Sequence, residues 1–552
     1  MAKYVLGVDF GTLSGRAVLI DVARGEDVAT AAMDYPHAVM DRTLAKTGKR
    51  LPPDYALQDP ADYLAVLERV IPEVLQKAKA DPGDVAGVGV DFTCCTLLSL
   101  DKNGAPLCFD KAFEQVPLAY SVLWKHHAAK PYADRLTEVA RERGEEFLAR
   151  CGGKIDEEWT FAKILQIFYE APELYAATDR FCEAGDWVVA QLTGKLSRSY
   201  HFAAYKRHYT EKAGYPSRDF FAAVDPALAD VTKKLDGALF KMGSCVGHVT
   251  KEAAARFSLA EGTPVAVAMP DGHCAAPGVG VCREGDMFAV LGTSGCFMAV
   301  GKSEALVPGI CGTVKDGILP GFYGYEAGLS SLGDHFAYAA KNLTSPAYVR
   351  EAQERGIPML KLLLEKAAQK KPGESGVIAL NWFNGNRSIL VDGSLSGCFV
   401  GMTLATAPED LLRALLEATA FGARNIIENF EQHGVEIRRI IACGGIARKD
   451  PFTMQLYADV WGREVAVTST TEGPARGAAI CAAVAAGLYP DVADAVERLG
   501  APLHCVYTPN GANFEVYNAL YTEYKALHDY FGRGANNVMK HLRALAAKQR
   551  GN

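Results

Sequence analysis

Residues 7–16 read GVDFGTLSGR, an acid followed by a turn of small and hydroxyl-bearing residues. The runs on either side of the turn are apolar, so the stretch predicts a β-hairpin that begins with a buried strand. Glycine lets the backbone approach a ligand closely, and the turn amides with the Thr12 and Ser14 hydroxyls would offer several donors to phosphate oxygens. The alternative is an ordinary hairpin in which Gly and Ser only satisfy the geometry of the turn.

A second stretch half a chain away has the same order of features. Residues 287–301, MFAVLGTSGCFMAVG, again read as a strand, a turn with Gly-Thr-Ser, and a strand. Two similar hairpins suggest a duplicated domain with one phosphate-binding turn in each half. The repeat favours nucleotide binding over the simple hairpin, and we expect both turns to face a cleft between domains at residues 1–280 and 281–552.

Length and composition agree with two large globular domains. The 552 residues exceed what one hydrophobic core usually supports, and the chain is 49% apolar and 22% charged. The formal net charge of −7 gives no sign of a nucleic-acid or anionic-membrane surface. The N-terminus enters a strand without a signal-like segment, and no apolar run approaches the roughly 20 residues that span a bilayer. We therefore expect a cytoplasmic protein with neither a nucleic-acid nor a membrane partner.

Strand and helix patterns alternate through most of the chain, which is typical of α/β proteins. The Val-rich runs at 85–93 and 263–272 each end at a polar residue followed by a loop, as buried strands do when they open onto a cleft. A long helix is predicted over 406–434, with a capping box formed by Thr406 and Glu409. A second helix is predicted after Asp450 as N-cap, with Gly462 beyond its end, between two strands.

Asp9, directly before the first turn, cannot itself bind phosphate because like charges repel. It can hold Mg²⁺ through water, and Mg²⁺ then bridges the phosphates. Arg16 could reach back to the phosphates or pair with a nearby acid. The spacings G-x-x-x-x-G-K-[ST] and G-x-G-x-x-G are both absent, so the sequence does not favour a P-loop or a Rossmann dinucleotide site.

The segments DFGTLSGR, VLGTSGC and CGGIARKDPFTMQLYADVWG resemble the two phosphate motifs and the adenosine motif of the FGGY carbohydrate kinases. The resemblance runs nearly end to end. It implies two ribonuclease H-like domains of the actin-like ATPase type that flank a cleft for ATP and a sugar, with Mg²⁺ as the metal. The segments VGVDFTCCTLL, VLWKHH, GGKIDEEWTFAKIL and LNWFNGNRS are similar to the branch of the family that phosphorylates L-ribulose at O5 in L-arabinose catabolism.

The resemblance also implies roles for single residues. Asp271, in AVAMPDG, takes the position of the catalytic base; without the family it would read as a turn-forming Asp-Gly. The implied sugar-binding residues are Cys95, Trp124, Lys206, Asp271 and Glu326. Without the family, Trp124 would be interpreted as a core aromatic residue, Lys206 as a surface lysine and Glu326 as an exposed acid.

The implied nucleotide contacts come from both halves of the chain. They are Gly11, Thr12, Ser14, Arg16, Gly292, Thr293, Ser294, Gly333, Gly444, Gly445 and Lys449. Lys449 departs from the Asn or Ser of many relatives, and Pro474 and Arg476 in EGPARGAAI depart from the usual A-L-G-A-A.

Two rival functions remain open. One is another kinase of the same family, acting on xylulose, ribitol or glycerol. The other is an actin- or chaperone-like ATPase, which would have no reason to carry Trp124, Lys206, Asp271 and Glu326. The sequence leaves the oligomeric state undecided, with a homodimer as one candidate.

Overall fold

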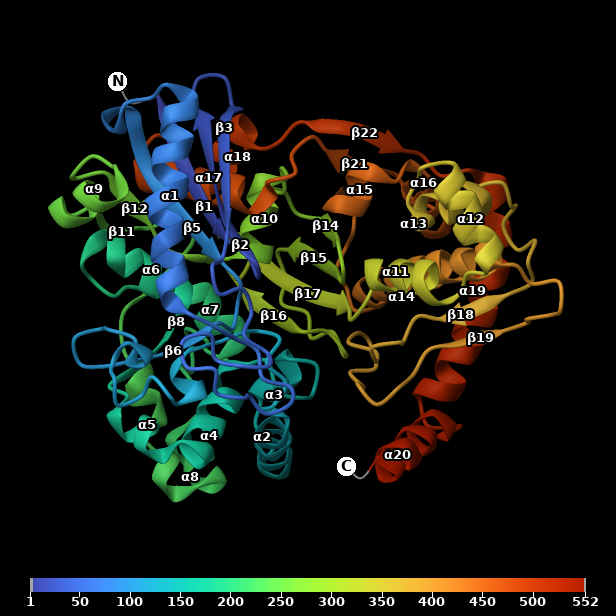
Figure 1. The fold of residues 1–552 in the computed structure, drawn as a ribbon, viewed down its shortest axis with the longest axis horizontal. Coiled ribbons are helices and arrows are strands. Elements are labelled where there is room, and N and C mark those ends of the chain that lie inside the picture. The colour runs from blue at the N-terminus through green and yellow to red at the C-terminus, as the bar shows by residue number, and fades with distance from the viewer. Residues whose placement is uncertain (1–2, 551–552) are drawn as a thin grey trace. The chain divides into compact units, whose positions relative to one another are not determined.

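The computed structural model describes residues 3–550 as two compact units (Figure 1). The first unit contains the residues up to Glu284, together with Thr313–Gly324 and Glu472–Ala501. The second contains Gly285–Gly312, Tyr325–Thr471 and the residues from Pro502 onward. Within residues 3–550, no helix is both long and apolar enough to cross a membrane.

The first unit is built on a mixed sheet whose strand order is β11-β12-β5-β1-β2-β3, with β13 also paired to β5. β2 runs antiparallel to both β1 and β3, whereas β5 runs parallel to β1, and β12 and β13 run parallel to β5. The strands are β1 (Tyr4–Phe10), β2 (Ser14–Asp21), β3 (Glu26–Asp34), β5 (Val85–Phe92), β11 (Cys245–His248), β12 (Pro264–Ala266) and β13 (Met269–Pro270). The parallel strands β1, β5 and β13 therefore end at the same edge of the sheet.

Helix α17 (Gly473–Ala485) packs closely against this sheet, and two strand glycines make that approach feasible. A Cβ on Gly7 would lie 1.8 Å from the carbonyl oxygen of Ala475, and one on Gly89 would lie 1.9 Å from that of Ala478. No side chain fits at either position. The late segment that contains α17 thus completes the core of the first unit.

The first unit also contains two smaller sheets, β4-β7-β6-β8 and a pair of short strands, β9 (Arg198–Ser199) and β10 (Leu239–Phe240). The helices are α1 (Pro60–Ala78), α2 (Lys130–Arg143), α3 (Phe147–Arg150), α4 (Thr160–Glu170), α5 (Pro172–Ala177), α6 (Ala184–Thr193), α7 (Tyr200–Lys206), α8 (Arg218–Val224), α9 (Lys251–Phe257), α10 (Asp271–Gly278) and α18 (Val492–Leu499). The smaller strands are β4 (Leu57–Gln58), β6 (Leu97–Leu100), β7 (Ser121–Val122) and β8 (Arg180–Glu183).

The second unit contains a sheet in the order β17-β15-β14-β20-β21-β22. β14, β20 and β21 are parallel and β15 returns antiparallel beside β14. The strands are β14 (Asp286–Leu291), β15 (Gly295–Gly301), β17 (Tyr323–Leu329), β20 (Arg439–Cys443), β21 (Val465–Thr468) and β22 (Leu503–Tyr507). The helices are α11 (Gly333–Asn342), α12 (Pro346–Glu354), α13 (Met359–Ala367), α14 (Pro408–Gln432), α15 (Gly445–Lys449), α16 (Pro451–Trp461), α19 (Gly511–Gly532) and α20 (Val538–Arg550).

Both predicted hairpins are confirmed, as β1-β2 and β14-β15. The N-cap at Asp450 is also confirmed, since its carboxylate accepts from the Thr453 amide at 3.2 Å. The predicted capping box at Thr406 and Glu409 is wrong by one residue. Pro408 starts α14, and the reciprocal bond runs from the Ala407 amide to the Asp410 carboxylate at 2.9 Å.

Candidate functional site

Three carboxylates gather where the parallel strands of the first unit end. The motif GVDF occurs at the end of β1 and again at the end of β5, and the two strands pair so that Asp9 lies beside Asp91. Met269 of β13 pairs with Asp91 on its other side, and Asp271 begins α10 two residues later. The register of three strands thus brings the predicted metal anchor and the predicted base to one edge.

Asp91 is a functional candidate that the sequence interpretation missed, although the repeated GVDF was a visible signal for it. It is fully buried, and burial together with the neighbouring Asp9 raises its pKa well above the usual range. Burial and the like charge of Asp9 thus favour the protonated form of the Asp91 carboxyl. Burial also raises the pKa of Asp9, while the bond from Asp91 and the charge of Arg16 oppose that rise.

Arg16 is held by acids on both sides. Its Nε lies 3.2 Å from Asp9 Oδ2, and its Nη1 lies 3.2 Å from Glu472 Oε2. Its Nη2 also donates to the Ser14 hydroxyl at 3.3 Å. Glu472, just before α17, was not predicted. Arg16 is thus a positive charge held beside the first turn, close to the predicted phosphate site.

Arg476, the departure noted in EGPARGAAI, has a structural role in the first unit. It is 3% exposed, its Nε donates to the Leu499 carbonyl at 2.7 Å, and its other nitrogens bind Asp27 and the Gly25 carbonyl. It therefore ties α17 to the β2-β3 turn and to the end of α18.

The first phosphate turn is braced by three side chains from elsewhere in the unit. The Gly11 amide donates to the Ser14 carbonyl at 3.0 Å, which closes the turn. The Tyr35 hydroxyl donates to the Gly11 carbonyl at 2.9 Å. The Thr12 carbonyl and hydroxyl accept from Gln58 Nε2 and Trp124 Nε1, at 2.7 and 3.0 Å respectively. Because the Thr12 hydroxyl accepts from the indole, its own proton stays available for a phosphate oxygen.

The bond from Trp124 joins the predicted sugar residues to the predicted phosphate turn. Behind Trp124, the ammonium of Lys163 donates to the carbonyls of Leu123 and Cys95, both at 2.6 Å. The alternative of a core aromatic residue is confirmed in part, because Trp124 packs against the hydrophobic cluster of this unit while remaining partly exposed.

Lys206 is buried, so the alternative interpretation of this residue as a surface lysine is wrong. It is only 5% exposed at the end of α7, with its ammonium 5.9 Å from the Trp159 ring centre and 5.6 Å from that of Tyr205. The Tyr205 ring in turn lies 4.4 Å from the ring of His273, two residues after Asp271. In the first unit, Lys206 thus lies near the Asp271 segment through the Tyr205 and His273 rings, and Lys163 links Cys95 to Leu123, the residue before Trp124.

The second unit brings the other predicted nucleotide residues together around its own turn. The Gly292 amide donates to the Ser294 carbonyl at 3.1 Å, as Gly11 does to Ser14 in the first turn. The Gly333 amide donates to the Gly292 carbonyl at 3.0 Å, and a Cβ on Gly333 would lie 2.8 Å from that oxygen. The Leu332 amide binds the Thr293 carbonyl at 2.7 Å.

The Gly444-Gly445 step lies against the same strand end. Gly444 has φ of +95°, and a Cβ there would come within 2.6 Å of the Leu291 carbonyl oxygen. Gly445 is exposed and starts α15, whose last residue is the exposed Lys449. Backbone amides and small residues thus leave an open surface beside the second turn.

Glu326 lies on β17 in the second unit and is 5% exposed, so its alternative as an exposed acid is wrong. Arg387 Nη2 lies 3.6 Å from Glu326 Oε1, so a positive charge lies beside the buried carboxyl. Glu326 belongs to a different unit from the other sugar residues, and its role toward a sugar remains a prediction.

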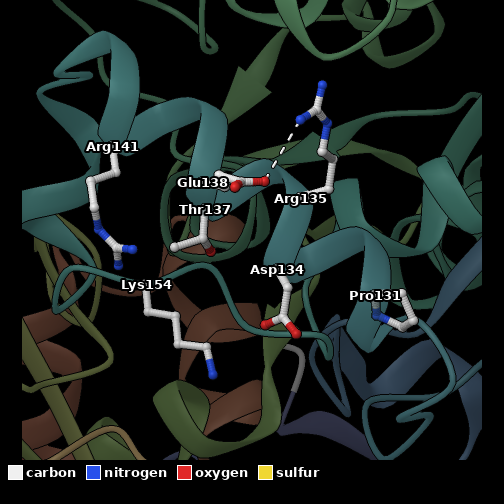
Figure 2. Close-up of a pocket in the computed structure, with 7 residues that line it drawn as sticks. All are labelled: Pro131, Asp134, Arg135, Thr137, Glu138, Arg141 and Lys154. Atoms are coloured by element: carbon white, nitrogen blue, oxygen red, sulfur yellow. Dashed lines mark ion pairs between the residues drawn. The ribbon is translucent and has the colours of Figure 1, made fainter.

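Figure 2 shows a pocket of about 490 Å³ on helix α2 of the first unit. Its lining is mostly charged, and Arg135 and Glu138, one turn apart on α2, form an ion pair at 3.7 Å. None of the predicted site residues lines it. We therefore do not assign the reaction to this pocket.

The acidic strand ends suit a hydrated Mg²⁺ better than a metal held by protein alone. Within residues 3–550, no group of three His, Cys, Asp or Glu side chains is arranged to hold a metal ion. Mg²⁺ prefers oxygen ligands and commonly keeps several waters, binding through one or two carboxylates and substrate phosphates. Asp9, at 6% exposure beside the first turn, fits this mode.

Comparison with known proteins agrees with this geometry. The N-terminal domain of the FGGY family of carbohydrate kinases matches residues 4–278, and the C-terminal domain of that family matches residues 287–486. A protein of Geobacillus thermodenitrificans named ribulokinase is 48% identical over 99% of both chains. A ribulokinase of Mycolicibacterium smegmatis is 46% identical over 98% of this chain and 96% of its own.

Solved structures of sugar kinases share the fold. A xylulose kinase from Rhodospirillum rubrum superposes with a TM-score of 0.79 at 26% identity, covering 95% of this chain and 98% of its own. A gluconate kinase from Lactobacillus acidophilus superposes with a TM-score of 0.80 at 19% identity, covering 96% and 99% of the two chains. The predicted two-domain α/β architecture of the actin-like ATPase type is confirmed.

Proposed function

Because this chain belongs to the FGGY family of carbohydrate kinases, and is a kinase that uses ATP to phosphorylate a sugar, we propose that its substrate is L-ribulose. The product is L-ribulose 5-phosphate, and the reaction serves L-arabinose catabolism. Since the reaction consumes ATP, we place it in the cytoplasm.

One structural observation carries the proposal. The Trp124 indole donates to the Thr12 hydroxyl at 3.0 Å, so a flat aromatic face suited to the C–H side of a sugar is bonded to a turn suited to phosphate. The choice of L-ribulose is supported by relatives named ribulokinase, which are 46–48% identical over nearly their full length.

In the proposed reaction Asp271 accepts the proton of the sugar O5 hydroxyl as that oxygen attacks the γ-phosphorus. The new O–P bond forms as the bond between the γ-phosphorus and the β–γ bridging oxygen breaks, and ADP leaves with that electron pair. Cys95, Trp124, Lys206 and Glu326 orient the sugar. Asp9 would hold a hydrated Mg²⁺, which would offset the charge of the phosphates.

The two turns bind and align the phosphates. In the first unit Thr12 and Ser14 provide donors, Gly11 closes the turn, and Arg16 is the nearby positive charge. In the second unit Thr293 and Ser294 provide donors and Gly292 closes the turn. Gly333, Gly444, Gly445 and Lys449 bind the adenosine and adjoining phosphate. Such positioning and charge compensation provide most of the catalysis in phosphoryl transfer.

The test is a substrate panel with ADP release as the readout. L-Ribulose, D-ribulose, xylulose, ribitol and glycerol are compared with a sample that lacks sugar. We expect the highest kcat/KM with L-ribulose and little ADP release without sugar. Preference for glycerol or xylulose would refute the substrate, and sugar-independent hydrolysis at the same rate would favour an actin- or chaperone-like ATPase. Light scattering on the same sample would test the candidate homodimer.

A further inference from the structure

Lys163 is the most completely enclosed lysine beside the proposed sugar residues. It lies on α4, its side chain is 0% exposed, and its ammonium donates to the carbonyls of Cys95, Leu123 and Val122 at 2.6, 2.6 and 3.4 Å. A buried ammonium is costly unless its protons are satisfied, and here three carbonyl oxygens satisfy them. The lysine is therefore committed to these two backbone segments.

Both segments carry residues that we assign to the sugar. The first is the turn Thr93–Thr96, where Cys95 has φ of +62°, an uncommon conformation for a side chain other than glycine. The second is the end of β7, where Leu123 precedes Trp124. The two segments flank the pairing of β6 with β7, Leu97 with Val122, and the Lys163 ammonium adds direct bonds to both segments.

Each segment also has hydrogen bonds of its own. The Thr96 hydroxyl donates to the Thr93 carbonyl at 2.9 Å, and the Leu123 amide donates to the Ala56 carbonyl at 3.1 Å. These bonds fix the local shape of each segment, and the β6–β7 pair holds the neighbouring strands side by side. Lys163 adds the bonds that reach the backbone of Cys95 and Leu123 themselves.

We propose that Lys163 is a positioning residue for sugar recognition, which sets the Cys94–Cys95 turn and the Trp124 ring at the separation that a ketopentose requires. It acts through these segments and does not touch the substrate. This inference rests on the proposed function.

The test replaces Lys163 with Met, which keeps the length and removes all three donors, and with Gln, which keeps part of the hydrogen bonding. Lys234→Met is the matched control, because Lys234 also donates to a backbone carbonyl in the first unit, that of Thr178, far in sequence from the sugar segments. Each variant is assayed with L-ribulose and ATP varied in turn.

We expect Lys163→Met to raise the KM for L-ribulose at least tenfold while the KM for ATP changes less than threefold. Lys163→Gln should give an intermediate KM for the sugar, and Lys234→Met should change neither. Equal increases in both KM values, or no increase for the sugar, would overturn the proposal. Failure of both Lys163 variants to fold would also overturn it, because the lysine would then serve the fold and not the sugar. If wild type prefers another sugar, the proposed function fails, and the KM comparison is made with that sugar.

Discussion

The hydrogen bond between Trp124 and Thr12 offers the sharpest test of how the sugar and phosphate sites are joined. Trp124→Phe keeps an aromatic face but removes the indole donor that lies 3.0 Å from the Thr12 hydroxyl. A partly buried, neutral hydrogen bond of this kind contributes about 1 kcal/mol. At about 1.4 kcal/mol per factor of ten, its loss corresponds to about a fivefold decrease in kcat/KM for L-ribulose.

Phe is also smaller than Trp, so the single variant mixes lost packing with the lost bond. A double-mutant cycle separates them, because Thr12→Val removes the acceptor while the packing loss stays the same. We expect Trp124→Phe to cost about fivefold more in wild type than in the Thr12→Val background, measured as kcat/KM by coupled ADP release. Equal costs in the two backgrounds would refute the idea that this bond links the two sites.

Three further predictions concern stability, pH and the sugar. Gly89→Ala would press a Cβ to within 1.9 Å of a backbone oxygen of α17, so we expect a loss of about 3 kcal/mol in urea unfolding, while Gly83→Ala, with nothing within 4 Å, should lose almost none. Burial raises the pKa of Asp186 from 3.8 to about 7, so the native state binds the proton more tightly than the unfolded state does, and stability falls as pH rises from about 4 to about 7. A shift of about 3 pKa units corresponds to about 4 kcal/mol of unfolding free energy. Asp186→Asn should therefore reduce the change in urea midpoint between pH 5 and 7.5. An unchanged pH dependence of the urea midpoint in that variant would contradict this assignment. Arg387→Met should raise the KM for L-ribulose about fivefold by removing the charge 3.6 Å from Glu326, and Arg387→Lys should recover part of the loss; normal sugar kinetics in the Met variant would refute a role for the pair.

Local patterns were enough to predict much of the fold. Both hairpins, the N-cap at Asp450 and the end of α16 at Gly462 follow from short-range rules, since each depends on bonds within a few residues. The start of α14 was misplaced because Thr406 and Glu409 have the spacing of a capping box, whereas Pro408 between them fixes the first helical turn.

Burial and long-range pairing were harder to predict. Lys206 and Glu326 are of residue types that usually lie at the surface, and only tertiary packing buries them. Asp91 is recognisable once β5 is paired with β1 in register, because that pairing sets it beside Asp9. No local signal indicates that residues 472–501 belong to the first unit. They belong there because α17 packs against the sheet at Gly7 and Gly89, where a side chain would not fit.

The central claim is that Asp271 receives the proton of a bound sugar hydroxyl during transfer from ATP. Asp271→Asn keeps the size of the side chain and removes its basicity, so a single-turnover measurement with L-ribulose and radiolabelled ATP tests the claim directly, with calorimetry to follow binding. We expect ATP and L-ribulose to bind within about threefold of wild type while formation of the sugar phosphate slows at least a hundredfold. Sugar phosphate formed by the variant at the wild-type rate would contradict the claim.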